Sequence, residues 1–227
     1  MNVKKDNYSR IAILIPTYNP TEKLKKVVNL LRKEHFNNII VVNDGSVNDR
    51  ILYDIKVSKI LGYGFNRGKG YALKTGFEYI QRLDVDGVIT LDDDLQHDIL
   101  DVKKIADLFL ENSSVYFGIR IFDKAPIVRR EANRLTSKMF KKIYNYDISD
   151  TQTGLRCFPK SILPKLIQIK GDKFDYELNQ LKYLVLNNYD IKKVIIKTIY
   201  NDNKSHYSGI VDSYRIMKVL LNKNNYI

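Results

Sequence analysis

The first half of the chain alternates apolar runs with segments of helical periodicity. An apolar run of four to eight residues predicts a buried strand, whereas apolar positions repeated every three to four residues predict an amphipathic helix. In chain order, these strand-like and helical segments are residues 11–15, 21–35, 39–42, 71–82, 87–91 and 99–111. Their alternation predicts an α/β fold, in which a mostly parallel sheet is flanked by helices.

The second half continues this pattern without a recognisable linker. Residues 115–121 are typical of a strand, and an arginine-bearing helical stretch and a Thr-Gln-Thr-Gly turn follow. Helical periodicity returns at residues 174–186, a β-rich run spans residues 191–199, and residues 211–221 form an amphipathic tail. Because 227 residues suffice for one α/β domain and are few for two, we expect a single domain.

Polar residues follow three of the predicted strands, at residues 16–20, 43–46 and 92–96. Parallel sheets of this class bind ligands at the carboxyl ends of their strands. We therefore expect these three loops to share one rim of the sheet and to converge on one crevice.

The most informative loop is the run Asp92, Asp93, Asp94, Leu-Gln96-His directly after an apolar strand. Alternation along an extended chain sends Asp92, Asp94 and Gln96 to one side and Asp93 to the other. Hard oxygen ligands suit Mg²⁺ or Mn²⁺, which makes Asp94 and Gln96 the first candidates for metal ligands. The alternative is that these acidic residues face water or cap the next helix, as Asp98 is expected to do.

The net charge and the cysteine content limit the classes of binding partner and the cellular compartment that we expect. Lys and Arg total 38 against 26 Asp and Glu, a formal net charge of +12, which favours anionic partners such as nucleic acid, nucleotide phosphates or acidic lipids. The single cysteine, Cys157, cannot form an internal disulfide. Since no apolar stretch approaches ~20 residues and no signal-peptide core is visible, we expect a cytoplasmic protein that contacts a membrane peripherally if at all.

Four motifs in order carry a resemblance to a known family. They are Ile-Pro-Thr-Tyr-Asn at 15–19, Val-Asn-Asp-Gly-Ser at 42–46, Asn-Arg-Gly-Lys-Gly at 66–70 and Leu-Asp-Asp-Asp-Leu-Gln-His at 91–97. The set resembles the family 2 glycosyltransferases of GT-A fold. With Asp-Thr-Gln-Thr-Gly-Leu-Arg at 150–156 and Ser-His-Tyr near the end, it looks most like the polyprenyl-phosphate sugar synthases, among them the dolichyl-phosphate mannosyl- and glucosyltransferases.

The resemblance implies a nucleotide-sugar donor of the GDP-mannose or UDP-glucose class and a bound Mg²⁺ or Mn²⁺. The donor contacts that it implies are Pro16, Tyr18, Asn19, Asp44, Asn66, Lys69, Gly70, Asp92, Asp93 and His206. The metal ligands that it implies are Asp92, Asp94 and Gln96. Two of these motifs have simpler interpretations, because Pro16 and Asn19 suit a strand-ending turn and Gly-Lys-Gly suits a flexible basic turn.

The resemblance also implies a polyprenyl-phosphate acceptor, which is ionised at neutral pH and needs no strong base. Arginines bind phosphate with paired donors, and the candidates are Arg120, Arg129, Arg130 and Arg134. The resemblance also implies that Arg156 lies beside the donor sugar. The catalytic candidates that it implies are Asp94, Arg120, Arg134, Asp150, Gln152 and Asp175. If the acceptor were a hydroxyl, Asp175 or Glu177 would be the base, and at most one of the two can face the site on a helix.

Several alternatives stay open. The sequence departs from the commonest family pattern at Asn43 and Asp93, and Asp93 leaves the choice among the three carboxylates unsettled. The main rival activity is transfer to a hydroxyl of a cell-surface polysaccharide. A basic nucleic-acid-binding module or an inactive scaffold would fit the charge, but neither explains the motifs. We expect residues 1–120 to bind nucleotide sugar and metal and residues 121–227 to bind the acceptor. We expect no binding of nucleic acid. The sequence is compatible with a homodimer or with a separate membrane partner.

Overall fold

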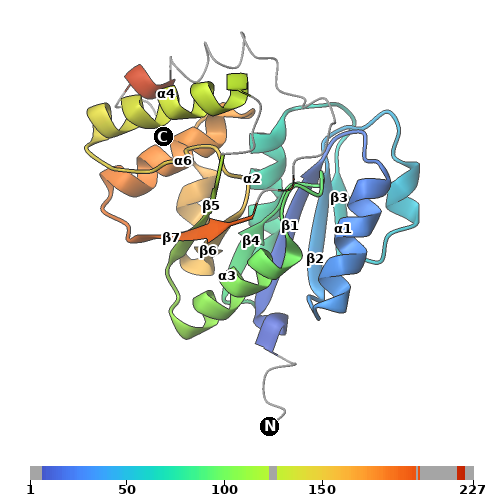
Figure 1. Cartoon of the computed structure of the whole chain (residues 1–227). Coiled ribbons are helices and arrows are strands. Elements are labelled where there is room, and N and C mark those ends of the chain that lie inside the picture. The colour runs from blue at the N-terminus through green and yellow to red at the C-terminus, as the bar shows by residue number, and fades with distance from the viewer. Residues whose placement is uncertain (1–6, 123–126, 198, 200–218, 223–227) are drawn as a thin grey trace.

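One sheet runs through the molecule. In the computed structural model, which describes residues 7–122, 127–197, 199 and 219–222, seven strands pair in the order β3-β2-β1-β4-β6-β5-β7 (Figure 1). The strands are β1 Ile11–Thr17, β2 Asn38–Asn43, β3 Lys59–Gly62, β4 Gly87–Thr90, β5 Val115–Arg120, β6 Arg156–Pro159 and β7 Ile191–Ile196. Strand β6 is antiparallel to β4 and β5, and the other neighbouring pairs are parallel. The predicted mostly parallel sheet is confirmed.

The central strands are buried on both faces, as their uninterrupted apolar runs predict. In β1, Ala12 and Leu14 pack into the core on one side of the sheet, and Ile11, Ile13 and Ile15 pack into the core on the other. Branched side chains fit such a doubly covered pleated surface well. The sheet therefore separates two apolar layers and holds its strand ends in fixed positions.

The sequence pattern does not predict β3 or β6. Strand β3 is a short, largely exposed edge strand. Strand β6 has the sequence Arg-Cys-Phe-Pro, which begins with a charged residue and ends with proline. Its pairing with β4 and β5 arises from tertiary contacts, and Cys157 is fully buried there.

Helices cover both faces of the sheet. The α-helices of the described residues are α1 Glu22–Lys33, α2 Lys69–Ile80, α3 Ile99–Glu111, α4 Ile127–Tyr144, α5 Leu163–Ile167 and α6 Asp175–Leu186, and the 3₁₀ helices are η1 Asn7–Arg10, η2 Arg50–Tyr53 and η3 Lys160–Ile162. Helices α1 and α3 pack on one face, and α2, α4, α5 and α6 pack on the other (Figure 1). Within the described residues, none of the helices is long and apolar enough to cross a bilayer.

Helix starts follow the local capping chemistry of the sequence. The Thr21 hydroxyl accepts a hydrogen bond from the Lys23 backbone N–H at the start of α1. At the start of α3, the Asp98 carboxylate accepts one from the Leu100 backbone N–H at 2.9 Å. Such caps satisfy N–H groups that have no partner in the first turn, and the predicted role of Asp98 is confirmed.

The carboxyl ends of β1, β2 and β4 lie at one edge of the sheet. Thr17 is opposite Asn43 in the β1–β2 pair, and the Asp44 backbone N–H donates to the Thr17 carbonyl at 2.8 Å. The Leu91 backbone N–H donates to the Leu14 carbonyl, which brings the loop after β4 to the same edge. The predicted common rim is confirmed, although Asn43 is still part of a strand.

A short C-terminal segment, residues 219–222, is fixed to α4 and α6. The Leu220 side chain is fully buried, and its carbonyl accepts a hydrogen bond from the Tyr144 hydroxyl at 2.9 Å. The buried Lys182 ammonium donates to the carbonyls of Val219 and Asn222 at 3.0 and 2.9 Å. The end of the predicted amphipathic tail thus docks on the helical layer, and the rest of that tail lies outside the described residues.

Lys182 should give the fold a measurable pH dependence. Burial lowers the pKa of Lys182 from 10.5 to about 8. Between pH 8 and 10 the unfolded chain therefore keeps a proton that the folded protein releases, so the free energy of unfolding rises with pH by up to about 1.4 kcal/mol per pH unit. Lys182→Met should lose this rise in urea unfolding at pH 8, 9 and 10. Equal slopes for the two proteins would contradict the assignment.

Candidate active site

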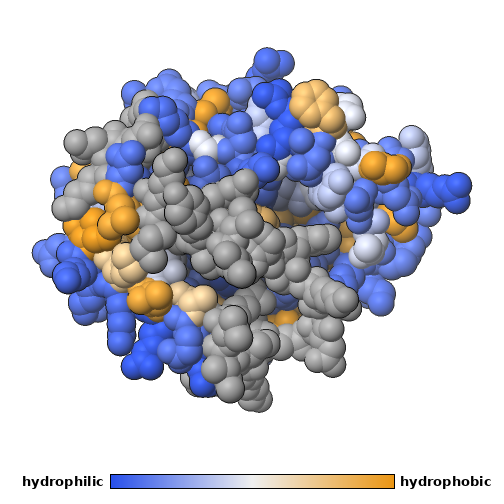
Figure 2. Space-filling model, turned by 90° about the horizontal axis from the view of Figure 1, so that it is seen from above, coloured by the Kyte–Doolittle hydropathy of each residue, from blue (hydrophilic) through white to orange (hydrophobic). Residues whose placement is uncertain are grey.

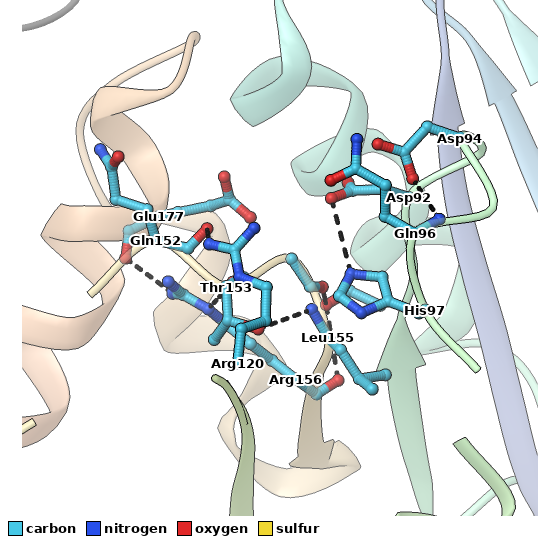
Figure 3. A network of polar contacts seen from close by, with 12 residues as sticks. Asp92, Asp94, Gln96, His97, Arg120, Gln152, Thr153, Leu155, Arg156 and Glu177 are labelled. Atoms are coloured by element: carbon cyan, nitrogen blue, oxygen red, sulfur yellow. Dashed lines mark hydrogen bonds and ion pairs between the residues drawn. The ribbon is translucent and has the colours of Figure 1, made fainter. Parts of the chain in front are cut away.

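Three adjacent aspartates follow β4 and take different directions. The Asp93 carboxylate accepts a hydrogen bond from the Thr17 hydroxyl of β1. Asp94 Oδ1 accepts one from the Gln96 backbone N–H at 3.0 Å. Asp92, Asp94 and Gln96 lie together at the exit of β4 (Figure 3). The alternation along this loop therefore separates Asp93 from the other two carboxylates, as the sequence predicts.

Lys69, the first residue of α2, lies between two carboxylates from distant parts of the chain. Its Nζ is 2.6 Å from Asp92 Oδ1 and 2.9 Å from Glu177 Oε1 on α6. Burial lowers the pKa of Lys69, but the two carboxylates raise it more, and the net shift is upward. Burial likewise opposes ionisation of Asp92, yet Lys69 and His97 hold the pKa of Asp92 below its ordinary value.

The pKa values of the other two aspartates, Asp93 and Asp94, are raised above the ordinary value. Burial raises the pKa of Asp93 to about 6, and the charges of Asp92 and Asp94 add to the shift while the Thr17 hydroxyl opposes it. Burial and the charge of Asp92 also raise the pKa of Asp94. Negative charge is therefore concentrated at the end of β4 and only partly compensated by Lys69.

This corner fits a Mg²⁺ or Mn²⁺ that the protein shares with a ligand. The part of the chain that the structure describes contains no group of three or more acidic, histidine or cysteine side chains arranged to hold a metal. Asp92 is engaged by Lys69, whereas Asp94 and Gln96 present oxygen donors, and a cation would relieve the repulsion that raises the pKa of Asp94. Mg²⁺ commonly takes one or two carboxylates and completes its shell with phosphate and water. The predicted ligands thus remain a proposal.

Asp44 organises the loop that precedes α2. Its Oδ1 accepts hydrogen bonds from the Tyr63 hydroxyl at 2.7 Å and the Arg67 backbone N–H at 2.8 Å. Its Oδ2 accepts from the Asn66 side-chain amide at 3.0 Å and the Gly68 backbone N–H at 2.9 Å. Both oxygens are used inside the protein, so Asp44 and Asn66 shape the rim. Their predicted contacts with a nucleotide stay predictions.

The glycines of this loop serve packing between helices, and the predicted contact of Gly70 with a donor stays a prediction. A Cβ on Gly70 would lie 2.5 Å from Tyr176 Cβ, and one on Gly68 would lie 2.4 Å from the Asp172 carbonyl oxygen. Gly68 also has a φ of 106°, which disfavours other residues. The missing side chains therefore let the start of α2 dock against α6, which places Lys69 next to Glu177.

The first loop contributes one exposed aromatic ring. Pro16 is buried within β1, and its predicted contact with a nucleobase stays a prediction. Asn19 has a φ of 52° and accepts a hydrogen bond from the Val47 backbone N–H at 3.0 Å, while its own N–H donates to the Ser46 hydroxyl. Asn19 therefore joins two loops of the rim. Tyr18 is 40% exposed and remains the candidate for a contact with a base.

Arg120 and Asp150, both predicted to be catalytic, bind each other. Arg120 Nε is 2.6 Å from Asp150 Oδ2, and Nη2 donates to Asp150 Oδ1 at 2.9 Å and to the Gln152 carbonyl at 3.1 Å. Burial raises the pKa of Asp150, but the guanidinium lowers it further, and the net shift is downward. The structure thus brings Arg120, Asp150 and Gln152 together as predicted. Their contacts with a substrate stay a prediction.

Arg156 lies below the site rather than in it, which corrects its assignment as a neighbour of the donor sugar. The side chain is fully buried and stacks on the Phe117 ring, 4.4 Å from the ring centroid. It donates to the carbonyls of Thr153 and Glu177 at 2.9 and 2.6 Å and to Gln180 Oε1 at 3.0 Å (Figure 3). Arg156 therefore fastens β6 to α6 and cannot reach a substrate.

The acidic pair on α6 resolves into one residue inside the site and one outside. The Asp175 carboxylate accepts a hydrogen bond from the Lys173 backbone N–H at 3.0 Å and lies against Gly171. Glu177 is buried and bound to Lys69. Only Glu177 of the pair therefore lies beside Lys69, because the position of Asp175 at the first turn of α6 directs it to the preceding loop. The predicted role of Asp175 as a base stays a prediction.

Two further residues shape the acidic corner. His97, which belongs to the motif at 91–97, is buried with its Nε2 3.9 Å from Asp92 Oδ2. Sequence reasoning missed the other residue, Gly154. A Cβ on Gly154 would lie 2.2 Å from Asp92 Oδ2, so the glycine of the Thr-Gln-Thr-Gly turn makes room for that carboxylate. The turn glycine was a visible signal, but its spatial neighbour was not.

Arg134 lines a separate cavity of about 400 Å³ between α4 and the segment before Asp150. The residues around it are Phe122, Arg130, Asn133, Arg134, Ser137, Lys138, Lys141, Asp147, Ile148 and Ser149. Phe122 also contacts the Arg120 guanidinium, 5.3 Å from the ring centroid, which connects the cavity with the Arg120–Asp150 pair. His206 and the side chain of Arg129 lie outside the described residues.

Comparisons with known proteins agree with this geometry. UDP-N-acetylglucosamine–dolichyl-phosphate N-acetylglucosaminyltransferase of Methanococcus voltae is 30% identical, over 93% of this chain and 94% of the relative. Dolichyl-phosphate beta-glucosyltransferase of Saccharomyces cerevisiae is 24% identical, over 74% and 61%.

Among solved structures, glucosyl-3-phosphoglycerate synthase from Mycobacterium tuberculosis, in complex with Mn²⁺ and UDP-glucose, matches with a TM-score of 0.71. The identity is 15%, over 94% of this chain and 78% of the other, so this likeness shows the fold alone, and the predicted GT-A fold is confirmed. The profile of the family described as Glycosyl transferase family 2 matches residues 12–167. The chain therefore belongs to glycosyl transferase family 2.

Proposed function

We propose that this glycosyltransferase transfers a sugar from a UDP-sugar to a polyprenyl phosphate of the dolichyl type. The observation that carries the proposal is the basic cavity at α4, which is joined through Phe122 to the Arg120–Asp150 pair. The relatives from Methanococcus voltae and Saccharomyces cerevisiae, by their names, act on dolichyl phosphate, and the former uses a UDP-sugar. This favours UDP over GDP.

The donor side of the site suits a nucleoside diphosphate. Tyr18 is exposed on the rim formed by the ends of β1 and β2 and offers a ring for stacking on a base. Asp94 and Gln96 would hold a Mg²⁺ or Mn²⁺, which when bound supplies positive charge to the departing diphosphate. Lys69 adds a fixed cation at the same corner.

The acceptor side suits a phosphate. Four cationic side chains, Arg130, Arg134, Lys138 and Lys141, line the cavity, against one carboxylate, Asp147. Guanidinium groups bind phosphate oxygens with paired N–H donors. An acceptor phosphate in this cavity would lie beside Arg120, where its oxygen could attack the anomeric carbon of the donor directly.

The rival activity, transfer to a hydroxyl, needs a free general base. Glu177 is bound to Lys69, and Asp175 is directed to the loop before α6. Neither carboxylate is therefore placed to take a proton from an acceptor. A phosphate acceptor needs no such base, and this favours the polyprenyl-phosphate proposal over the polysaccharide alternative.

A lipid acceptor requires contact with a membrane surface, which we propose is electrostatic and peripheral, at the cytoplasmic face. The described surface seen from above is mostly hydrophilic, and its hydrophobic residues form small separate groups (Figure 2). Helix α4 exposes Arg130, Arg134, Lys138, Lys141 and Lys142. Basic residues of this kind each contribute about 1 kcal/mol to binding at an anionic leaflet.

A thermal-shift screen tests the donor class. UDP-glucose, UDP-N-acetylglucosamine and GDP-mannose are each added with Mn²⁺ or with EDTA. A ligand that binds only the folded protein raises its apparent Tm. At a ligand concentration of 100 times Kd, the free energy of unfolding rises by about 2.7 kcal/mol. We expect stabilisation by a UDP-sugar in Mn²⁺ and little in EDTA. Stabilisation by GDP-mannose alone would overturn the donor assignment.

Asp94→Ala tests the cation site. We expect turnover to fall at least about 100-fold, because roughly 3 kcal/mol of stabilisation of the leaving diphosphate is lost. Asp93→Ala should cost less, since Asp93 is bonded to Thr17 on β1. The measurement is the initial rate of sugar transfer with saturating Mn²⁺. Near-normal turnover of Asp94→Ala in a chelating buffer would end the metal hypothesis.

Arg134→Ala tests the acceptor cavity. Loss of one charge-assisted contact should raise the KM for polyprenyl phosphate about 10-fold and leave the KM for the donor unchanged. Lys33→Ala is the control, because Lys33 is exposed at the end of α1 and does not line the cavity. Equal effects of the two changes would indicate general charge rather than a binding cavity.

A further inference from the structure

Glu177 is a buried carboxylate on α6 that has no part in the transfer step proposed above. Its carboxylate lies 2.9 Å from Lys69 Nζ, and its side chain is 5% exposed. Lys69 Nζ also lies 2.6 Å from Asp92 Oδ1. A lysine ammonium has three N–H donors, and two carboxylates engage it here. One of these two carboxylates lies at the exit of β4 beside Asp94, and the other lies on α6, away from that loop.

The helix that carries Glu177 is fixed against the helix that carries Lys69. The Tyr71 backbone N–H donates to the Asp172 carbonyl at 3.1 Å, and Lys74 Nζ lies 2.6 Å from Asp172 Oδ1. The close contact of Gly70 with Tyr176 lies between these points. The distance between Lys69 and Glu177 is therefore set by helix packing and does not depend on the loop after β4.

A divalent cation bound at this corner would compete with Lys69 for Asp92. Both are positive, so they repel each other, and a lysine on a flexible stem would otherwise move away into solvent. Glu177 opposes this movement, because its buried carboxylate also binds the ammonium. The lysine would then remain at the corner beside the diphosphate.

We propose that Glu177 is a positioning residue, which holds the Lys69 ammonium at the acidic corner so that Lys69 binds the leaving diphosphate. This inference rests on the proposed nucleoside-diphosphate donor. In the transfer step the bond between the anomeric carbon and the diphosphate oxygen breaks and its electron pair stays on that oxygen. The acceptor oxygen forms the new bond, and Lys69 donates a hydrogen bond without giving up its proton.

A double-mutant cycle separates this role from a general effect of charge or folding. The proteins are wild type, Glu177→Gln, Lys69→Met and the double variant, each first checked for cooperative thermal unfolding. Glu34→Gln is the matched control, because Glu34 Oε2 lies 2.7 Å from Lys103 Nζ in an ion pair of α3 with the end of α1, on the other face of the sheet. Affinities for UDP and GDP with Mn²⁺ are measured by calorimetry, and kcat and KM are measured with the sugar donor.

We expect Glu177→Gln to weaken binding of the diphosphate about 10-fold and to lower kcat by a larger factor, since Lys69 assists departure of the diphosphate. In the Lys69→Met background, Glu177→Gln should change either quantity less than about 2-fold, because residues that act through one contact are not additive. Glu34→Gln should match wild type. If Glu177→Gln does not fold, Glu177→Asp, which keeps the charge but shortens the side chain, is expected to lose about 3-fold in affinity.

Two results would overturn the proposal: wild-type affinity and kcat in Glu177→Gln, or losses that multiply fully in the double variant. Failure of the proposed function has a different signature. If the cycle shows coupling in diphosphate binding but no sugar reaches polyprenyl phosphate, only the acceptor assignment fails. If wild type binds neither UDP nor GDP, both proposals fall.

Discussion

The structure depends on compensating partly buried charge at the exit of β4. Asp92 leaves the sheet half-buried, where an unpaired carboxylate is destabilising. Lys69 and His97 lie beside it, and Lys69 in turn forms an ion pair with Glu177. A second buried pair, Arg120 and Asp150, lies next to the basic cavity. Asp92, Lys69 and Glu177 come from three different segments, and Arg120 and Asp150 from two others, so the fold must be complete before the charges are balanced.

This requirement explains several features that have no chemistry of their own. Gly154 leaves the space that the Asp92 carboxylate occupies, and Gly68 and Gly70 allow α2 to approach α6. Arg156 stabilises the same region from below by fastening β6 to α6. A buried ion pair is weak evidence for stability in general. Here the pairs hold side chains in place around a corner where a charged ligand is proposed to bind.

The sequence predicts the sheet, the main helices and the common rim, because these follow from apolar periodicity and from the rule that places the ends of parallel strands together. It does not predict β6, since Arg156 and Pro159 give no strand pattern and the pairing is imposed by β4 and β5. It does not predict the packing of Pro16 and Gly70 or the local turn of Asp175, residues that it assigns to a ligand. Motif order identifies the right loops, but the direction of a side chain depends on contacts between residues far apart in the chain.

The antiparallel strand β6 has a consequence for how this enzyme could be recombined with its relatives. It comes from the second half of the chain but pairs with β4 of the first half, and it separates β4 from β5. The turn before it supplies Gly154, which lies against Asp92. A chimera joined near residue 120 would therefore combine a β4 exit from one parent with a turn from the other. Mismatched parents would crowd the carboxylate or leave a void, so the exit of β4 and the turn before β6 must come from the same parent.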